Sequence, residues 1–291
     1  MPLEEGGKPI APCVFTVDVE DWYHILASPG APPVEHWASM PSRIEYSLPR
    51  LLDILDEAGK RATFFFLGWI AQRHPGLVRE TRARGHEIAA HGYLHRLVYE
   101  MSEHEFSDDA VRTRKLLEDI SGAGVTGYRA PGFSVTPRTP WFWEALARAG
   151  YCYDSSIFPA YRAHGGFPGA DPRPDEVTGA HGIIREFPIS ITRILGRPVC
   201  LFGGGYLRLS PYRWMAGRVR RLQSEGQPVI FYLHPREIDP DAPRLRLGPW
   251  RQFKSYVNLR GTELKVRRLL GEFEFMTFAE WLARHPAAGE R

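Results

Sequence analysis

The sequence has little of what marks a disulfide-rich, membrane-spanning or repetitive protein. Its three cysteines, Cys13, Cys152 and Cys200, lie far apart and match neither a zinc-binding nor a redox pair. No apolar run approaches the ~20 residues that span a bilayer, and residues 1–12 lack the basic and apolar segments of a signal peptide. Repeats and low-complexity tracts are absent too. We therefore expect buried, reduced thiols and a cytoplasmic location, at most peripheral to a membrane.

The sequence also lacks a strong excess of charge of one sign. A formal net charge of +3 in 291 residues is far below the clustered positive charge of nucleic-acid-binding proteins. Hydrophobic residues make up 43% of the chain, which is enough for a large core. The length is normal for one α/β barrel. We therefore expect a globular protein that does not bind nucleic acid.

Short apolar runs alternate with segments of helical periodicity along most of the chain. One helix opens with Ser102 and Glu105, a capping-box pattern. Such alternation predicts a parallel sheet or barrel with its active face at the carboxyl ends of the strands. Strands are expected within residues 14–22 and at 62–67, 87–90, 151–154 and 228–234, and a strand end that turns into a loop is expected at 127–132. Helices are expected at 44–58, 70–84, 102–121, 140–149 and 212–224.

Three regions depart from this alternation. Residues 165–182 are rich in glycine and proline and form a long excursion. Residues 183–209 are β-rich, with Gly203-Gly204-Gly205 in a turn that lacks the context of a phosphate-binding loop. Beyond His234 the chain becomes basic, and a last strand and helix are expected within residues 273–282.

This organisation predicts one catalytic domain. We expect it to span residues 13–235, after an N-terminal tail at residues 1–12. The basic C-terminal extension, residues 236–291, is expected to pack on the barrel.

Three carboxylates end the first apolar run. Asp18, Glu20 and Asp21 lie within four positions at the end of a predicted buried strand. An ionised carboxylate in apolar surroundings is costly unless it meets a cation, a hydrogen-bond donor or a metal. The three acids therefore require partners elsewhere in the chain.

Suitable partners follow the other predicted strands. His91 and His95 are four residues apart, a spacing found in divalent-metal sites that a carboxylate completes. His234 ends the last strand and has the residue type of a general acid near neutral pH. Arg129 ends another strand, where its guanidinium would hold Asp18 ionised. We expect these groups to share one face of the barrel.

These features, in this order, resemble the motifs of the polysaccharide deacetylase family, carbohydrate esterase family 4. The resemblance runs from about residue 14 to residue 235, and it implies a distorted (β/α) barrel that removes N- or O-acetyl groups from glycans. The matched motifs are Asp18 with Glu20 or Asp21, His91 with His95, Arg129-Ala130-Pro131, Tyr153 to Ser156, and Leu233-His234.

Two positions differ from the family's pattern. Adjacent aspartates are usual, whereas here the order is Asp18-Val19-Glu20-Asp21. A regular strand places Asp18 and Glu20 on one face and favours Glu20 as the metal carboxylate, while a bulge or a strand end after Val19 favours Asp21. Gly92 replaces the usual hydroxyl residue after the first histidine, which puts a hydrogen bond behind the ligand in doubt.

The resemblance also implies roles. Asp18 is the expected catalytic base beside Arg129, and His234 is the expected acid, with Asp154 as a candidate to orient it. A divalent metal, zinc above all, is expected on His91, His95 and either Glu20 or Asp21.

Contacts to the sugar are expected at the same face. Aromatic side chains near the motifs are candidates for stacking on sugar rings, and these are Trp22, Tyr23, Tyr93, Tyr128, Phe133, Trp141 and Tyr206. The residues expected to bind substrate are Trp22, Tyr93, Pro131 and Leu233.

A subgroup of these deacetylases, found with exopolysaccharide assembly systems, is also similar to this sequence. The shared stretches are residues 18–22, 91–95, 153–159 and 203–206 and the extension after His234. This similarity implies removal of N-acetyl groups from an amino sugar in a polysaccharide or its precursor. The implied partners are that glycan and assembly machinery at the membrane, and the basic extension could approach an anionic polymer or a lipid-pyrophosphate carrier.

Two other functions remain open at this point. The first is hydrolysis of a small non-peptide amide on the same scaffold. The second is glycan binding without catalysis, which a complete set of acid, base and metal-binding residues disfavours.

Overall fold

The computed structural model describes residues 11–26, 30–162 and 164–286. Most of the predicted N-terminal tail lies outside these ranges. The strands are β1 (Cys13–Val19), β2 (Thr63–Phe66), β3 (Glu87–Ala90), β4 (Gly127–Tyr128), β5 (Tyr153–Asp154), β6 (Asp175–Gly179), β7 (Gly182–Glu186), β8 (Thr192–Ile194), β9 (Arg197–Val199), β10 (Val229–Leu233) and β11 (Phe275–Met276). The α-helices are α1 (Val34–Trp37), α2 (Ile44–Glu57), α3 (Gly68–Arg73), α4 (Pro75–Ala83), α5 (Glu103–Ser121), α6 (Phe142–Arg148), α7 (Gly204–Leu209), α8 (Tyr212–Ser224), α9 (Pro249–Tyr256), α10 (Thr262–Glu272) and α11 (Phe278–Arg284).

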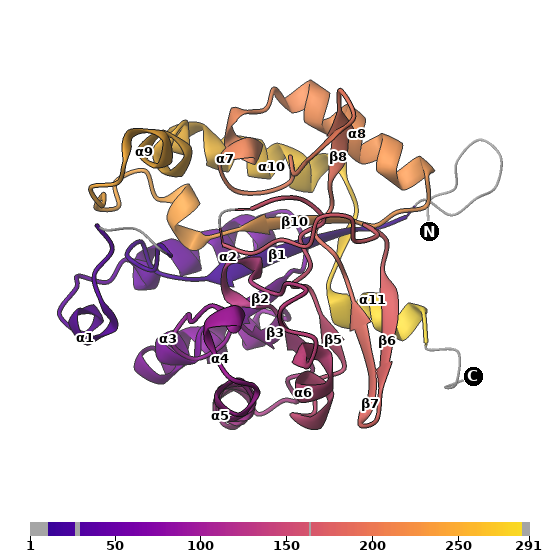
Figure 1. The fold of residues 1–291 in the computed structure, drawn as a ribbon. Helices are drawn as coiled ribbons and strands as arrows, with labels where there is room; N and C mark the ends of the chain where they lie inside the picture. The colour runs from indigo at the N-terminus through magenta and orange to yellow at the C-terminus, as the bar shows by residue number, and fades with distance from the viewer. Residues whose placement is uncertain (1–10, 27–29, 163, 287–291) are drawn as a thin grey trace.

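The largest sheet is mostly parallel and is organised around β1. Its order is β10-β1-β2-β3-β4-β5-β7-β6, and β11 also pairs with β1. Within it, only the β6–β7 hairpin is antiparallel among the described strands. Strand β1 runs toward the end of the molecule that carries α1 and α9, and both termini lie at the opposite end (Figure 1). The carboxyl ends of the parallel strands therefore gather near α1 and α9.

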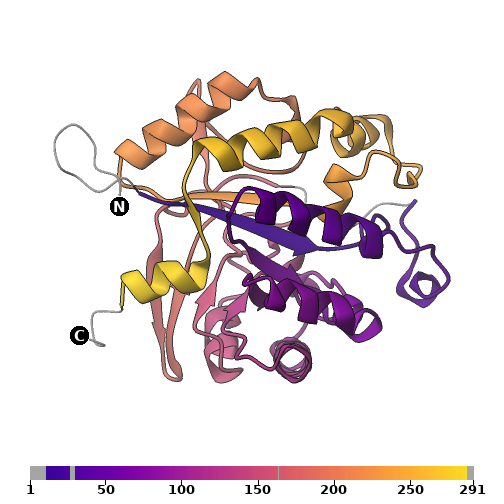
Figure 2. The same ribbon diagram turned by 180° about the vertical axis from the view of Figure 1, so that it is seen from behind.

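The strands are apolar on both faces because each face is covered. Along β1 and β2, Phe15 and Phe64 belong to the outer core under the helices, whereas Val14 and Phe65 belong to the cluster inside the barrel. Figure 2 shows α2, α8 and α10 over the outer side of β1 and β10. Near-continuous apolar runs are what strands buried on both faces require.

The barrel is closed toward β10 by a side chain and a short backbone bridge. Ser190 follows β7, and its Oγ accepts a hydrogen bond from the Ile230 N–H (2.9 Å) and donates to the Pro228 carbonyl (3.2 Å). A backbone bridge between Gly203 and Tyr232, with the Tyr232 N–H donating to the Phe202 carbonyl (3.1 Å), adds a second link to β10. The structure thus confirms the predicted mixed α/β fold with a distorted barrel.

The C-terminal segment forms the floor of the barrel. Strand β11 pairs with the first residues of β1, just before β2 takes over that edge. The Phe278 ring then enters the interior, with its centroid 4.7 Å from that of Phe187 and 5.1 Å from that of Tyr153. The strand and helix expected within residues 273–282 are present, and they are part of the barrel itself.

Three local predictions from the sequence are wrong. The helix expected at 70–84 is two helices, because Pro75 cannot continue α3 and instead starts α4. The glycine run at 203–205 opens α7 instead of making a turn. Cys152 is exposed, while the other two cysteines are buried as expected.

The sequence predicts that the chain has no membrane-spanning segment. Within residues 11–26, 30–162 and 164–286, none of the helices combines the length and the apolar character needed to cross a bilayer.

The turn after β3 is fixed by the half-buried carboxylate of Asp109. Gly92 has a φ of 70°, which favours glycine, and the following Tyr93 N–H donates to both carboxylate oxygens of Asp109 on α5 (2.9 and 3.0 Å). A Cβ on Gly92 would lie 3.4 Å from both Asp109 Oδ1 and the Tyr128 hydroxyl. These are the groups that a hydroxyl side chain at position 92 would meet.

Truncating the floor residue should destabilise the whole barrel. Phe278→Ala removes a fully buried ring, so we expect the free energy of unfolding to fall by about 3–5 kcal/mol in urea denaturation. Phe253→Ala is the matched control, because that ring is 47% exposed, and its loss should be below about 1 kcal/mol. Equal losses in the two variants would contradict the role of the floor.

Asp109 should make stability depend on pH. Burial raises its pKa from 3.8 to about 6, so the folded protein holds this proton more tightly than the unfolded chain does. Its contribution is therefore present below about pH 4 and is lost as the pH rises to about 6, a change of about 3 kcal/mol.

The variant Asp109→Asn isolates this contribution. It should be as stable as the parent at pH 4 and more stable at pH 7, measured by urea denaturation across that range. Asp108→Asn changes an exposed neighbour and should keep the parent's pH profile. Parallel profiles for the parent and Asp109→Asn would rule the effect out.

Candidate active site

The parallel strands bring the predicted site residues to one end of the barrel. Asp18 lies near the end of β1 and Glu20 just beyond it, His91 follows β3, Arg129 follows β4 and His234 follows β10. All five side chains are buried or nearly so. The expectation that they share one face is met by the geometry.

Glu20, not Asp21, faces the imidazoles. Glu20 Oε1 lies 3.0 Å from His95 Nε2 and 3.4 Å from His91 Nε2. The carboxylate of Asp21 instead accepts hydrogen bonds from the Ser42 hydroxyl (2.6 Å) and from the backbone N–H of residue 43 (3.0 Å). Strand β1 ends at Val19, where the Glu20 N–H donates to the Asp18 carbonyl (3.0 Å). The expectation that a strand end at this point would favour Asp21 is therefore wrong, because Glu20 faces the imidazoles although the strand stops before it.

The three groups fit a divalent metal. The ligand atoms of Glu20, His91 and His95 lie within 4.8 Å of one another. His91 Nδ1 is 2.7 Å from the Arg129 carbonyl, which places its proton on that nitrogen and leaves Nε2 as an acceptor. Both Nε2 atoms are buried without a hydrogen-bond partner among the described residues. Acceptors that face a carboxylate in this way need a cation between them.

The backbone at His95 supports this geometry. Its φ is 56°, which is uncommon outside glycine. Strained backbone of this kind persists where the surroundings fix a side chain, and here it aims the second imidazole at Glu20.

Asp18 is paired with a fully buried arginine. Arg129 Nη1 donates to Asp18 Oδ1 (2.7 Å) and to the Thr16 hydroxyl (2.7 Å), and its Nη2 donates to the Ser155 hydroxyl (2.9 Å). The guanidinium also lies over the Phe65 ring. Burial by itself raises the pKa of Asp18, but the nearby positive charges, Arg129 first, hold it below its ordinary value. Asp18 is therefore ionised at neutral pH.

His234 is oriented by Glu237. Its Nδ1 lies 2.7 Å from Glu237 Oε1, and its Nε2 lies 3.4 Å from Glu20 Oε1. Glu237 in turn accepts a buried hydrogen bond from Arg208. Burial, followed by the charge of Arg236, lowers the pKa of His234.

The prediction that Asp154 orients His234 is wrong. Asp154 accepts hydrogen bonds from the Ser156 hydroxyl (2.6 Å) and N–H (3.1 Å). Burial and the neighbouring Glu186 raise its pKa well above the ordinary value. It therefore supports the turn after β5. The signal for Glu237 was its place three residues after His234, which sets the two side chains together in a 3₁₀ turn.

Two further residues complete the surroundings of Glu20. Arg236 Nη1 donates to Glu20 Oε2 (2.7 Å), so the two carboxylate oxygens have different partners. Burial first, and the surrounding charges next, keep the pKa of His24 well below its ordinary value, so its ring is neutral. His24 Nδ1 accepts from the Asp21 N–H (2.9 Å). From the sequence alone, Arg236 is expected only as part of the basic extension.

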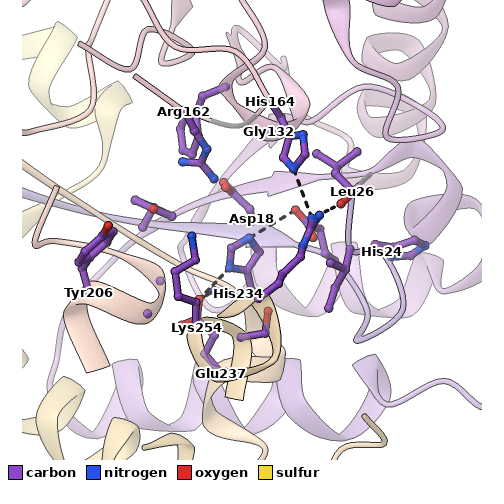
Figure 3. Close-up of a pocket in the computed structure, with 18 of the residues that line it drawn as sticks. Asp18, His24, Leu26, Gly132, Arg162, His164, Tyr206, His234, Glu237 and Lys254 are labelled. Carbon is purple, nitrogen blue, oxygen red and sulfur yellow. Dashed lines mark hydrogen bonds and ion pairs between the residues drawn. The ribbon is translucent and has the colours of Figure 1, made fainter. Parts of the chain in front are cut away.

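A cavity of about 550 Å³ opens beside these groups (Figure 3). Asp18, Glu20, His95 and His234 lie at its base, and Phe133, Tyr206 and Trp250 are among its aromatic walls. Phe133 has a φ of 54°, a strained value for a bulky residue. The volume suits an organic ligand with apolar and polar contacts.

The four residues predicted to bind substrate do not line this cavity. Trp22 is buried, with its indole N–H bonded to the Pro41 carbonyl (2.9 Å), and Leu233 is buried in the outer core. Tyr93 lies against Gly68 and under the Arg112 guanidinium, while Pro131 is buried at the start of a 3₁₀ turn. As contacts to a ligand in the cavity, these four are replaced by Phe133, Tyr206 and Trp250.

Comparison with known families gives two matches. Residues 40–153 match the polysaccharide deacetylase family. Residues 155–283 match a domain of unknown function, DUF3473, which is consistent with the subgroup associated with exopolysaccharide assembly.

Curated relatives match part of the chain. A peptidoglycan deacetylase of Helicobacter pylori is 30% identical over 113 residues, which is 39% of this chain and 38% of the relative. A chitooligosaccharide deacetylase of Azorhizobium caulinodans is 33% identical over 84 residues, which is 28% of this chain and 40% of the relative. The chain thus spans well under half the length of either relative.

Solved structures match nearly all of the chain. A polysaccharide deacetylase candidate from Mycobacterium smegmatis has a TM-score of 0.64 at 21% identity, over 97% of this chain and 92% of its own. The allantoinase PuuE has a TM-score of 0.63 at 16% identity, over 97% and 96%. At these identities the structures show the fold alone, and the sequence matches cover part of the chain. Residues 40–153 of this chain thus match the polysaccharide deacetylase family, within a fold that resembles that of solved polysaccharide deacetylase structures.

Proposed function

We propose that this protein is a metal-dependent deacetylase that removes N-acetyl groups from amino sugars of a polysaccharide or its precursor. The observation that carries the proposal is the order of groups at the base of the cavity. An ionised Asp18 held by Arg129 lies on one side, Glu20 lies in the middle and His234 follows. Beside Glu20, the Nε2 atoms of His91 and His95 have no hydrogen-bond partner within the part of the chain that the structure describes.

In this proposal His91, His95 and Glu20 hold the metal. When bound there, a divalent ion supplies Lewis acidity toward the acetyl carbonyl and lowers the pKa of a water molecule. Zinc is the ion that two imidazoles and one carboxylate suit best. Arg236, bonded to the second oxygen of Glu20, leaves Oε1 as the ligand atom.

The protein's own groups divide the proton transfers. Asp18 accepts the proton of the attacking water, because Arg129 keeps this carboxylate ionised although it is buried. The Nδ1–H of His234 donates to Glu237, so the proton that this ring gains on becoming an imidazolium is on Nε2. His234 then donates to the departing amine nitrogen, and Glu237 stabilises the imidazolium before transfer.

A role in exopolysaccharide assembly is the finer part of the proposal. It is supported by the match of residues 155–283 and by the sequence similarity to that subgroup. The proposed partners are an N-acetylated glycan and the membrane-associated machinery that handles it.

Hydrolysis of a small amide is the second candidate. The fold shared with an allantoinase is the observation that favours it. Acetate release from N-acetylglucosamine oligomers, compared with ammonia or urea release from small cyclic and linear amides, separates the two activities.

Loss of one imidazole should remove metal and activity together. The His91→Ala variant lacks one of the three proposed metal ligands. Elemental analysis should therefore find less than a tenth of the parent's metal, and the rate of acetate release should fall by at least about 100-fold. His104→Ala is the matched control, since that side chain is 84% exposed on α5. A His91→Ala protein with full metal content and activity would disprove the ligand assignment.

Replacing the base should separate chemistry from metal binding. Asp18→Asn keeps the size of the side chain but cannot accept the proton, so kcat should fall by about 10²- to 10⁴-fold with metal content unchanged. Asp119→Asn on α5 is exposed and should behave as the parent does. An active Asp18→Asn variant would assign the proton acceptor to another group.

A further inference from the structure

Basic side chains gather on one wall of the cavity. Arg162 and His164 come from the loop after β5, and Arg251 and Lys254 come from α9. In Figure 3, Arg162 and Lys254 reach into the cavity from different elements, beside Asp18 and His234. The wall is thus assembled from two segments of the chain that lie far apart in sequence.

The carboxylates that line the cavity are already paired with other cations. Asp18 pairs with Arg129, Glu20 with Arg236, and Glu237 with Arg208. Within the part of the chain that the structure describes, no carboxylate lies within ion-pair distance of Arg162 or Lys254. Instead, Arg162 packs on two aromatic rings, with its Cζ 4.7 Å from the centroid of Phe133 and 5.0 Å from that of Phe158. Lys254 Nζ lies 5.4 Å from the centroid of the Trp250 ring.

These positive charges act on one another. Burial, followed by the charges of Arg251, Arg162 and Lys254, lowers the pKa of His164 to about 4. Burial and then Arg162 and Arg236 lower the pKa of Arg251. Like charges held together in a partly desolvated cavity are costly, and an anion placed among them removes the cost.

We propose that this wall binds an anionic group of the substrate, a carboxylate or a phosphate, attached to the acetylated sugar or to its immediate neighbour. The inference rests on the proposed deacetylase function. The wall and the proposed catalytic groups line one cavity of about 550 Å³, so the anion and the acetyl group must be close in the same molecule. Tyr206 and Trp250 are 48% and 67% exposed at this cavity, and they offer faces for the sugar rings.

Three substrates of similar size distinguish the sources of the anion. The first is a neutral tetramer of N-acetylglucosamine, and the second is a tetrasaccharide that alternates N-acetylglucosamine with glucuronic acid. The third is N-acetylglucosamine on a short-chain lipid diphosphate. The proposal expects at least about tenfold higher kcat/KM for the uronate or the diphosphate substrate than for the neutral one, and the better of the two identifies the anion. This advantage should shrink as the salt concentration rises.

Variants of the wall test the assignment to residues. Arg162→Gln and Lys254→Gln should each lower kcat/KM for the preferred anionic substrate by about 10- to 100-fold, and by less than about threefold for the neutral tetramer. Arg197→Gln and Lys115→Gln remove exposed cations elsewhere and should change neither value. Equal kcat/KM for neutral and anionic substrates, or equal losses on both in the wall variants, would overturn the proposal.

A binding measurement separates this inference from the proposed function. If no glycan releases acetate, the deacetylase proposal fails. Titration calorimetry with the de-N-acetylated uronate tetrasaccharide then tests, without any catalysis, whether the wall binds an anion. Binding that weakens about tenfold in Arg162→Gln keeps the anion site, and equal affinity in parent and variant overturns it.

Discussion

Inside the barrel, the Arg129 guanidinium lies against the Asp18 carboxylate, and both side chains are almost completely buried. Breaking such a pair by removing one partner leaves an uncompensated charge and costs about 3–5 kcal/mol. The structure satisfies the remaining donors of Arg129 with Thr16 and Ser155, so β1, β4 and the turn after β5 are tied together through one side chain. The position of the proposed base is therefore set by a contact that also joins three parts of the barrel.

A second constraint is that the two carboxylate oxygens of Glu20 have different partners. One of its oxygens faces the imidazoles of His91 and His95, and the other accepts from Arg236. Burial opposes the ionised form of Glu20, but the charges around it hold its pKa well below the ordinary value. Because Arg236 follows β10 and the two histidines follow β3, Glu20 links opposite sides of the cavity.

Much of this site follows from the sequence because strand ends in a parallel barrel meet at one edge. That rule was enough to group Asp18, His91, Arg129 and His234. Alternation along β1 favoured Glu20 over Asp21, and the structure shows Asp21 bonded to Ser42 instead. Such patterns are local, or they depend only on the direction of strands.

The partners that the sequence did not reveal depend on packing between distant segments. Arg236 is expected from the sequence only as part of the basic extension, and Arg208 has no predicted role, yet both pair with buried carboxylates. The expected sugar-binding residues Trp22 and Tyr93 are near the motifs in sequence but point into packed layers. The walls come instead from Phe133, held with a positive φ, and from α7 and α9, whose positions depend on the fold of the C-terminal half.

The floor made by β11 and Phe278 has a consequence for how the chain folds. Strand β11 pairs with β1, so the two ends of the described chain must meet before the interior is complete. Contacts between such distant segments slow folding, since a long loop must close first. On the ribosome, residues emerge from the N-terminus onward. The barrel would therefore lack its floor until β11 and α11 have been synthesised.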